Sequence, residues 1–348
     1  MHRTLGEGSD PRWHIWALTV LGAVAYFEGS LDEAATVLRD AWSLARRHGQ
    51  EDVGTSVLFT QGHIARVRGD FVTAQQRYAQ VLGRWRRQGD GTGIANALLQ
   101  VGALALQQGD LETAAARLEE ALAAARAVGG REGVGIGLEG LGLVAEARGD
   151  PATARARFAE ALTHYRDLGM RAGVTNVSVT LAGLALDAGE PAAARRHLRE
   201  TLDDAQAQLA AGRRWLRVAG TTPPPRWFSL PRVLLSLACL AAAESQPERA
   251  LRLAGAADAL NPTWRAGPPG WPGTGAPDPL VGRADRWLAV ARAALAEPAQ
   301  EAAWTAGRTM PLELAVADAL EAAAAPASAR ADVDALRPNA AGAGPHTG

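Results

Sequence analysis

The feature that most constrains this chain is a glycine that recurs every 40 residues. Gly29, Gly69, Gly109, Gly149 and Gly189 are each followed by Ser, Asp or Glu. A second series, Gly49, Gly89, Gly129 and Gly169, has the same period and lies 20 residues out of phase. Glycine commonly ends a helix in the left-handed conformation, and a Ser or Asp that follows can cap the next helix. Two such marks in each period predict two helices per repeat.

Small and large residues inside the predicted helices keep the same period. The small ones in the first helix of each pair are Gly22, Gly62, Gly102, Gly142 and Ala182. Large ones share one position of the second helix, namely Leu38, Tyr78, Leu118, Phe158 and Leu198. A glycine inside a helix costs roughly 1 kcal/mol relative to alanine, so its recurrence predicts close contact with a neighbouring backbone. On this interpretation Gly142→Leu destabilises the protein, whereas Gly142→Ala is harmless or mildly stabilising.

The boundaries of these helices follow from the same marks. First helices are predicted to end near residues 28, 68, 108, 148 and 188, which gives ten helices in antiparallel pairs over residues 13–210. Ser30 and Glu33 have the spacing of a capping box, and Pro151 and Pro191 stand in first turns. A sixth repeat reproduces the pattern if 16 residues are inserted within about residues 211–226. That insertion, which contains three prolines, either interrupts the solenoid or folds over its groove.

The last third of the chain has a different pattern. Residues 261–279 are rich in Pro, Gly and Trp, and helical patterning returns over residues 280–296. A short helix is expected around residues 301–305, and a last one with Thr309 as its cap and Pro311 in its first turn. The resulting organisation is a flexible N-terminus (1–12), a solenoid (13–260), a loop with a helical C-terminal cap (261–325) and a disordered tail (326–348).

Two stretches carry a resemblance to known families. The pattern Leu-Gly-x-x-Ala followed by Gly-Asp-x-x-x-Ala, over residues 141–154, resembles the tetratricopeptide repeat, although that repeat has about 34 residues. HEAT-like repeats share the length of 40 residues but lack this Gly/Ala pattern, and they rank second. Residues 253–260 and 304–315 resemble the module that closes the repeat array in LuxR-type activators and predicted bacterial ATPases. The resemblance implies an all-α, right-handed solenoid of about six helix pairs with a helical C-terminal cap.

Composition narrows the classes of function. All 36 basic residues are arginine, and the net charge of −1 with interspersed signs argues against direct nucleic-acid binding. Without lysine there is no phosphate-binding loop of the Gly-x-x-x-x-Gly-Lys type, and no helix-turn-helix signature is present. The single cysteine, Cys239, fits a reducing cytoplasm, and no apolar run approaches the ~18 residues of a membrane span. Seven histidines without a helical i, i+4 pair predict no metal site; no cofactor is expected.

The resemblance also implies where a ligand would bind, because first helices line the concave groove of tetratricopeptide arrays. The groove positions map onto Trp16, Tyr26, Phe59, His63, Arg66, Asn96, Glu139, Glu146, Asn176 and Asp187. We expect a binding or scaffold protein that recognises a peptide, a partner protein or a small molecule there, in regulation or signalling. A solvated face without a ligand would have a similar mixture of residues. The familiar Lys/Asn clamp for a peptide carboxylate is incomplete without lysine.

Two alternatives remain open. An enzyme could use the groove as an active site, for instance in a biosynthetic pathway, with His63 and either Glu139 or Asp187 as an acid–base pair. Four tryptophans near the C-terminal cap, Trp264, Trp271, Trp287 and Trp304, are expected to form a satellite core, with a ligand-stacking site as the second interpretation.

Overall fold

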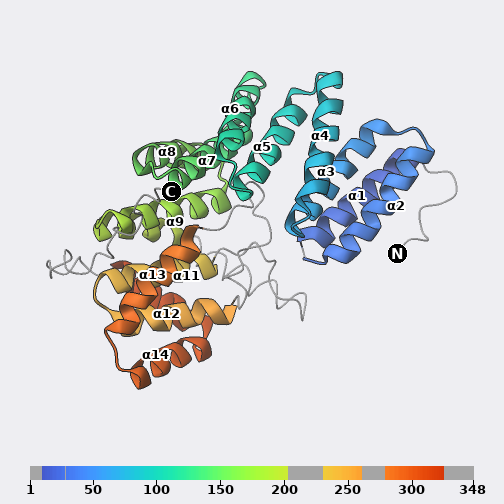
Figure 1. Cartoon of the computed structure of the whole chain (residues 1–348). Helices are drawn as coiled ribbons and strands as arrows, with labels where there is room; N and C mark the ends of the chain where they lie inside the picture. Colours follow the sequence, from blue (N-terminus) through green and yellow to red (C-terminus); the bar gives the residue numbers. More distant parts are fainter. Residues whose placement is uncertain (1–9, 28, 203–229, 261–278, 325–348) are drawn as a thin grey trace, which may run out of the picture. The chain divides into compact units, whose positions relative to one another are not determined.

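The structure is a computed structural model of the chain, and it describes residues 10–27, 29–202, 230–260 and 279–324 (Figure 1). Every regular element within these residues is an α-helix, which confirms the all-α helical-repeat prediction. The chain divides into two compact units, whose described parts are residues 10–170 and residues 171–202, 230–260 and 279–324. The predicted insertion at 211–226 and the predicted tail at 326–348 lie outside the described residues.

The N-terminal unit consists of four helix pairs. Its helices are α1 (Pro11–Phe27), α2 (Leu31–Arg47), α3 (Glu51–Val67), α4 (Phe71–Gln88), α5 (Gly91–Gln107), α6 (Leu111–Ala127), α7 (Arg131–Ala147) and α8 (Pro151–Asp167). Each helix packs on the next one along the chain, and the first helices also contact one another, α1 with α3 and α5 with α7. The first helices end within one residue of the predicted positions.

The glycine marks have the conformation that the sequence predicts. All nine glycines of the two series have positive φ, from 62° at Gly49 to 79° at Gly29. Asp70, Asp110 and Asp150 each accept a hydrogen bond from the backbone N–H three residues later. The predicted capping box at Ser30 is wrong, because the Ser30 side chain makes no cap hydrogen bond. Its backbone, with φ −81° and ψ 64°, resembles that of Asp70, with φ −80° and ψ 74°, whose side chain does cap its helix.

The packing between the helices of a pair rests on the two periodic series. A Cβ added at Gly22, Gly62, Gly102 or Gly142 would lie 2.6–2.7 Å from a side-chain carbon of Leu38, Tyr78, Leu118 or Phe158, respectively. Close packing at these glycines is therefore confirmed, but the partner is a large side chain of the second helix rather than a backbone. The same geometry argues against a harmless Gly142→Ala, since the new Cβ would already meet the buried Phe158 ring.

The first helix of the array presents an apolar face. Trp13, Trp16, Val20, Leu21 and Val24 are exposed on α1. Forty residues on from Val24 and Ala17, Ile64 and Val57 are buried in the core that α2 and α3 share. Val24 is therefore exposed on α1, whereas its counterpart Ile64 on α3 is buried. None of the described helices combines the length and the apolar character that a membrane crossing requires.

The C-terminal unit contains the fifth helix pair, the sixth pair and the cap. Its helices are α9 (Arg171–Asp187), a helical segment at residues 191–202, α11 (Leu230–Ala243), α12 (Pro247–Leu260), α13 (Pro279–Ala293), α14 (Glu297–Thr309) and α15 (Leu312–Ala324). The predicted helix at 301–305 is longer than expected, and Thr309 is wrong as a cap of α15. It is the last residue of α14, and its hydroxyl donates to the carbonyl oxygen of Thr305.

Candidate functional site

The side chain that stands out in the N-terminal unit is Arg66, near the end of α3. It is only 1% exposed, and it is the largest fully buried side chain in the described parts of the chain. The charge of Arg66 acts to lower the pKa of Tyr26 on α1, His63 on α3 and Tyr78 on α4. The sequence predicts Tyr26, Phe59, His63 and Arg66 as groove residues, and the structure brings these four together. We call them, with Tyr78, the Arg66 cluster.

His63 is the centre of the aromatic part of the Arg66 cluster. Its Nδ1 lies 3.2 Å from the hydroxyl oxygen of Tyr78, a hydrogen bond. Its ring centroid lies 4.5 Å from that of Phe59 and 6.2 Å from that of Tyr26. Burial, and secondarily the charge of Arg66, lowers the pKa of His63 to about 3. The imidazole is therefore neutral at pH 7, and Arg66 carries the charge of the cluster.

The guanidinium of Arg66 is only partly satisfied. Burial raises the pKa of Tyr78 to about 12, although a hydrogen bond with Arg66 acts in the opposite direction. The Nε and Nη2 atoms of Arg66 are buried without any hydrogen-bond partner. Removing an ion from water costs several kcal/mol unless a counter-charge and hydrogen bonds compensate. A buried guanidinium with two idle donors is therefore prepared to receive an anion or a strong acceptor.

The chemistry of the cluster suits binding better than catalysis. An imidazole whose pKa is about 3 is a weak base at neutral pH. The three members of the alternative acid–base site each contact another group: His63 contacts Tyr78, Glu139 accepts from the Tyr165 hydroxyl at 2.5 Å, and Asp187 pairs with Arg283 and Arg286. Among the described residues no group of three His, Cys, Asp or Glu side chains is placed to hold a metal ion.

The remaining predicted groove residues do not join the Arg66 cluster. Trp16 is 56% exposed beside Trp13, and Asn96 of α5 is also exposed. Glu139 and Glu146 lie on α7, the first buried and the second half-buried. Asn176 is buried in the C-terminal unit with its Nδ2 unpartnered. Each of these residues lies on the helix that the sequence predicts for it, but outside the Arg66 cluster.

Sequence reasoning missed Tyr78 and Tyr165 as site residues. Tyr78 belongs to the periodic series of large residues and was assigned to core packing, which the structure bears out. Its hydroxyl nevertheless adds a polar group to the cluster. The signal lay in the series itself, because Leu38, Leu118, Phe158 and Leu198 fill the same position without a hydroxyl. Tyr165 stands outside that series, and its pKa is raised by burial and by the neighbouring Glu139.

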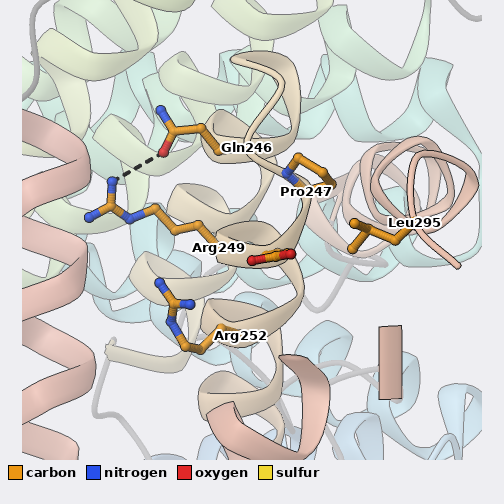
Figure 2. A pocket seen from close by; sticks show the side chains of 6 residues that line it. Gln246, Pro247, Arg249, Arg252 and Leu295 are labelled. Carbon is orange, nitrogen blue, oxygen red and sulfur yellow. Dashed lines mark hydrogen bonds between the residues drawn. The ribbon is translucent and has the colours of Figure 1, made fainter. Parts of the chain in front are cut away.

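The C-terminal unit contains a pocket of about 350 Å³ lined by Gln246, Pro247, Glu248, Arg249, Arg252 and Leu295 (Figure 2). Arg249 donates to Gln246 across it. The Nε atoms of Arg249 and Arg252 each lie 2.8 Å from an oxygen of Asp318, which lowers the pKa of that carboxyl although burial opposes the shift. Because the arginines of this pocket are bound to an acid of α15, we interpret it as part of the packing of α12 on α15.

The tryptophans near the cap are only partly described. Trp264 and Trp271 lie outside the described residues, while Trp287 and Trp304 are half-buried. The Arg292 guanidinium lies 5.7 Å from the centroid of the Trp304 ring, at cation–π distance. Trp304 is therefore engaged in packing within the unit, in agreement with a structural role.

Comparison with known proteins supports the repeat fold. Residues 55–127 match the family model of the tetratricopeptide repeat. No curated protein matches the chain. BtubC (BKLC) from P. vanneervenii is a similar solved structure, with 17% identity, coverage of 67% of this chain and 92% of that one, and a TM-score of 0.52. At this identity the likeness concerns the fold alone.

Two further solved structures are less similar in shape. PilF of Pseudomonas aeruginosa is 20% identical over 73% of this chain and 95% of its own, with a TM-score of 0.47. A tetratricopeptide repeat protein from Parabacteroides merdae is 14% identical over 80% and 98%, with a TM-score of 0.35. Residues 55–127 therefore contain repeats that match the tetratricopeptide model, and repeats of that kind generally mediate protein–protein interactions.

Proposed function

We propose that this protein is a binding scaffold that holds a polypeptide partner on the first-helix face of its N-terminal unit. The observation that carries the proposal is the Arg66 cluster, a neutral histidine, a buried arginine and three aromatic rings gathered by α1, α3 and α4. Repeats of this family generally bind proteins, which supports a polypeptide over a small molecule. A cytoplasmic location, which the single cysteine favours, and a regulatory context, which the resemblance to LuxR-type regulators implies, are part of the proposal.

Two further observations favour an extended partner. Trp16 on α1 and Asn96 on α5, both predicted groove residues, are exposed, and their helices come before and after α3 along the chain. An exposed tryptophan offers a large apolar contact surface, and an asparagine offers both a donor and an acceptor. A peptide segment can contact such positions on successive helices, whereas a small molecule would need them to converge on one cavity.

Site-specific photo-cross-linking tests the proposal. A benzoylphenylalanine probe replaces Asn96 or Trp16, and the matched control replaces Glu119, an exposed residue on the second helix α6. We expect the two groove probes to form adducts with the same protein and the Glu119 probe to form none with it. Equal labelling at all three positions, or different proteins at the two groove positions, would contradict binding on the first-helix face.

A further inference from the structure

We propose that Arg66, with Tyr26, His63 and Tyr78 around it, is a recognition site for an acidic side chain of the bound polypeptide. The inference rests on the proposed function and deepens it by naming the chemistry of the contact. The ligand group is a carboxylate, which Arg66 would bind through its Nε and Nη2 atoms.

The other buried arginines show what is unusual about Arg66. Three arginines are buried in the described parts of the chain: Arg66, Arg195 and Arg283. Arg195 pairs with Glu244, and Arg283 pairs with Asp187 at 2.7 Å. Arg66 makes no ion pair with a carboxylate of the described residues. Its positive charge acts to lower the pKa of Tyr26, His63 and Tyr78. Two of the three sites thus contain a counter-ion, and the described residues supply none at Arg66.

The identity of the idle atoms points to a carboxylate. Nε and Nη2 form one edge of the planar guanidinium, and their two parallel N–H bonds match the two oxygens of a carboxylate. Both atoms are buried without a partner. A phosphate group would carry more negative charge than this single cation balances, since the neighbouring imidazole is neutral at pH 7.

The surroundings determine which carboxylate fits. Tyr26 and His63 are half-buried and near enough to the fully buried guanidinium to be affected by its charge, so a ligand group must reach inward past aromatic rings. A Glu or Asp side chain presents a carboxylate at the end of a thin apolar stem, which suits such a buried cation. A chain terminus brings its own carboxylate with bulkier backbone, and the experiment therefore separates the two sources.

Binding to an array of decapeptides measured with the full-length protein tests the site. Each peptide is present as the free acid, as the C-terminal amide, and as the amide with Asp and Glu replaced by Asn and Gln. We expect amidation to leave binding intact and the loss of acidic side chains to weaken it at least tenfold. Arg66→Gln should produce the same loss, whereas Arg117→Gln, an equal change of charge on the exposed face of α6, should not.

Thermal melting without peptide distinguishes a binding role from a structural one. An arginine kept for a ligand is an unsatisfied charge in the free protein, so Arg66→Met should leave the melting temperature unchanged or raise it. A lower melting temperature for Arg66→Met together with unchanged peptide binding would overturn the inference. The inference would also be overturned if amidation alone abolished binding, or if the wild-type protein showed no preference for acidic peptides. In either case the cross-linking experiment would still test the proposed scaffold function.

Discussion

A single contact between a glycine and a large side chain is repeated in each helix pair of the N-terminal unit. Gly62 faces Tyr78, and Gly142 faces Phe158, each so closely that a methyl group would overlap the ring. Packing, rather than helix flexibility, therefore explains the glycine at this position. It makes room for a residue that fills the space between the two helices, and the energy of burying that residue offsets the lower helix propensity of glycine.

This contact predicts opposite effects for two Gly→Ala substitutions. At Gly142 the new Cβ would lie 2.7–3.0 Å from ring carbons of Phe158, so Gly142→Ala should destabilise the protein by about 1–3 kcal/mol. At Gly83, inside α4, the nearest atom is an Arg87 nitrogen at 3.7 Å, so Gly83→Ala should stabilise by about 0.5–1 kcal/mol. Urea denaturation of the two variants measures both.

A compensating variant checks the cause of the first effect. In the fifth repeat Ala182 and Leu198 hold the equivalent positions, and both are fully buried. Combining Gly142→Ala with Phe158→Leu installs that pair in the fourth repeat and should recover part of the lost stability. If the double variant is less stable than the sum of the two single losses, overlap with the Phe158 ring is not the cause.

The sequence alone could not predict which of the groove side chains are buried. The sequence places Arg66 on the correct helix and near His63, because the period of 40 residues fixes the register. Burial depends on what neighbouring helices add, and the side chains close to Arg66 include Tyr26 of α1 and Tyr78 of α4. Asn96 stands at a groove position too, yet it is exposed. Two predicted groove positions on successive first helices thus differ in burial, with a buried charge at Arg66 and a solvated amide at Asn96.

At the scale of the helix, the same register has different surroundings in α1 and α3. Ile64 of α3 is 4% exposed in the core shared with α2, whereas Val24 of α1, 40 residues earlier, is 47% exposed. Repeat proteins require neighbours or polar caps at their ends to cover such faces. The apolar character of α1 therefore reflects the repeat pattern, and its energetic value depends on whether another surface covers it.

A matched pair of truncations measures that value. Ile64→Ala removes buried carbons and should cost about 2–4 kcal/mol of unfolding free energy. Val24→Ala removes exposed carbons and should change the unfolding free energy by no more than about 0.5 kcal/mol. Chemical denaturation of both variants at one protein concentration gives the comparison. Comparable losses for the two would mean that the α1 face is covered in solution.

Helix boundaries were predictable where they repeat and unpredictable where they do not. The glycine marks locate the ends of α1 to α9 because each mark is a local backbone requirement. The cap has no such period, and α14 is longer than its sequence suggests. A Cβ at Gly307 would lie 1.9 Å from the carbonyl oxygen of Arg252, and one at Gly255 would lie 2.3 Å from that of Trp304. This close crossing of α12 and α14 is a tertiary contact, which a local pattern cannot reveal.

At the scale of the whole molecule, the two units use their first-helix positions differently. In the N-terminal unit His63 of α3 contacts Tyr26 of α1 and Tyr78 of α4. In the C-terminal unit, Gly183 and Asp187 of α9 occupy the registers of His63 and Val67, and Arg283 of α13 fits against the first and pairs with the second. The predicted groove residue Asp187 thus serves to attach the cap to the fifth repeat, across 96 residues of sequence.

This attachment predicts a loss of stability confined to one unit. Arg283 is buried although Asp187 itself is exposed, so Asp187→Asn removes the carboxylate that neutralises an enclosed guanidinium, at a cost of about 1–3 kcal/mol. The control is Asp167→Asn, because Asp167 pairs with Arg131 in solvent, where an ion pair contributes about 0–1 kcal/mol.

Hydrogen exchange followed by mass spectrometry should show faster exchange in α9, α11 and α13 of the Asp187 variant. Protection of α3 to α6 should stay at the wild-type level, since their cores lie within the other unit. Faster exchange throughout both units would show that they unfold together, and an unchanged pattern would show that the ion pair does not hold the cap in place.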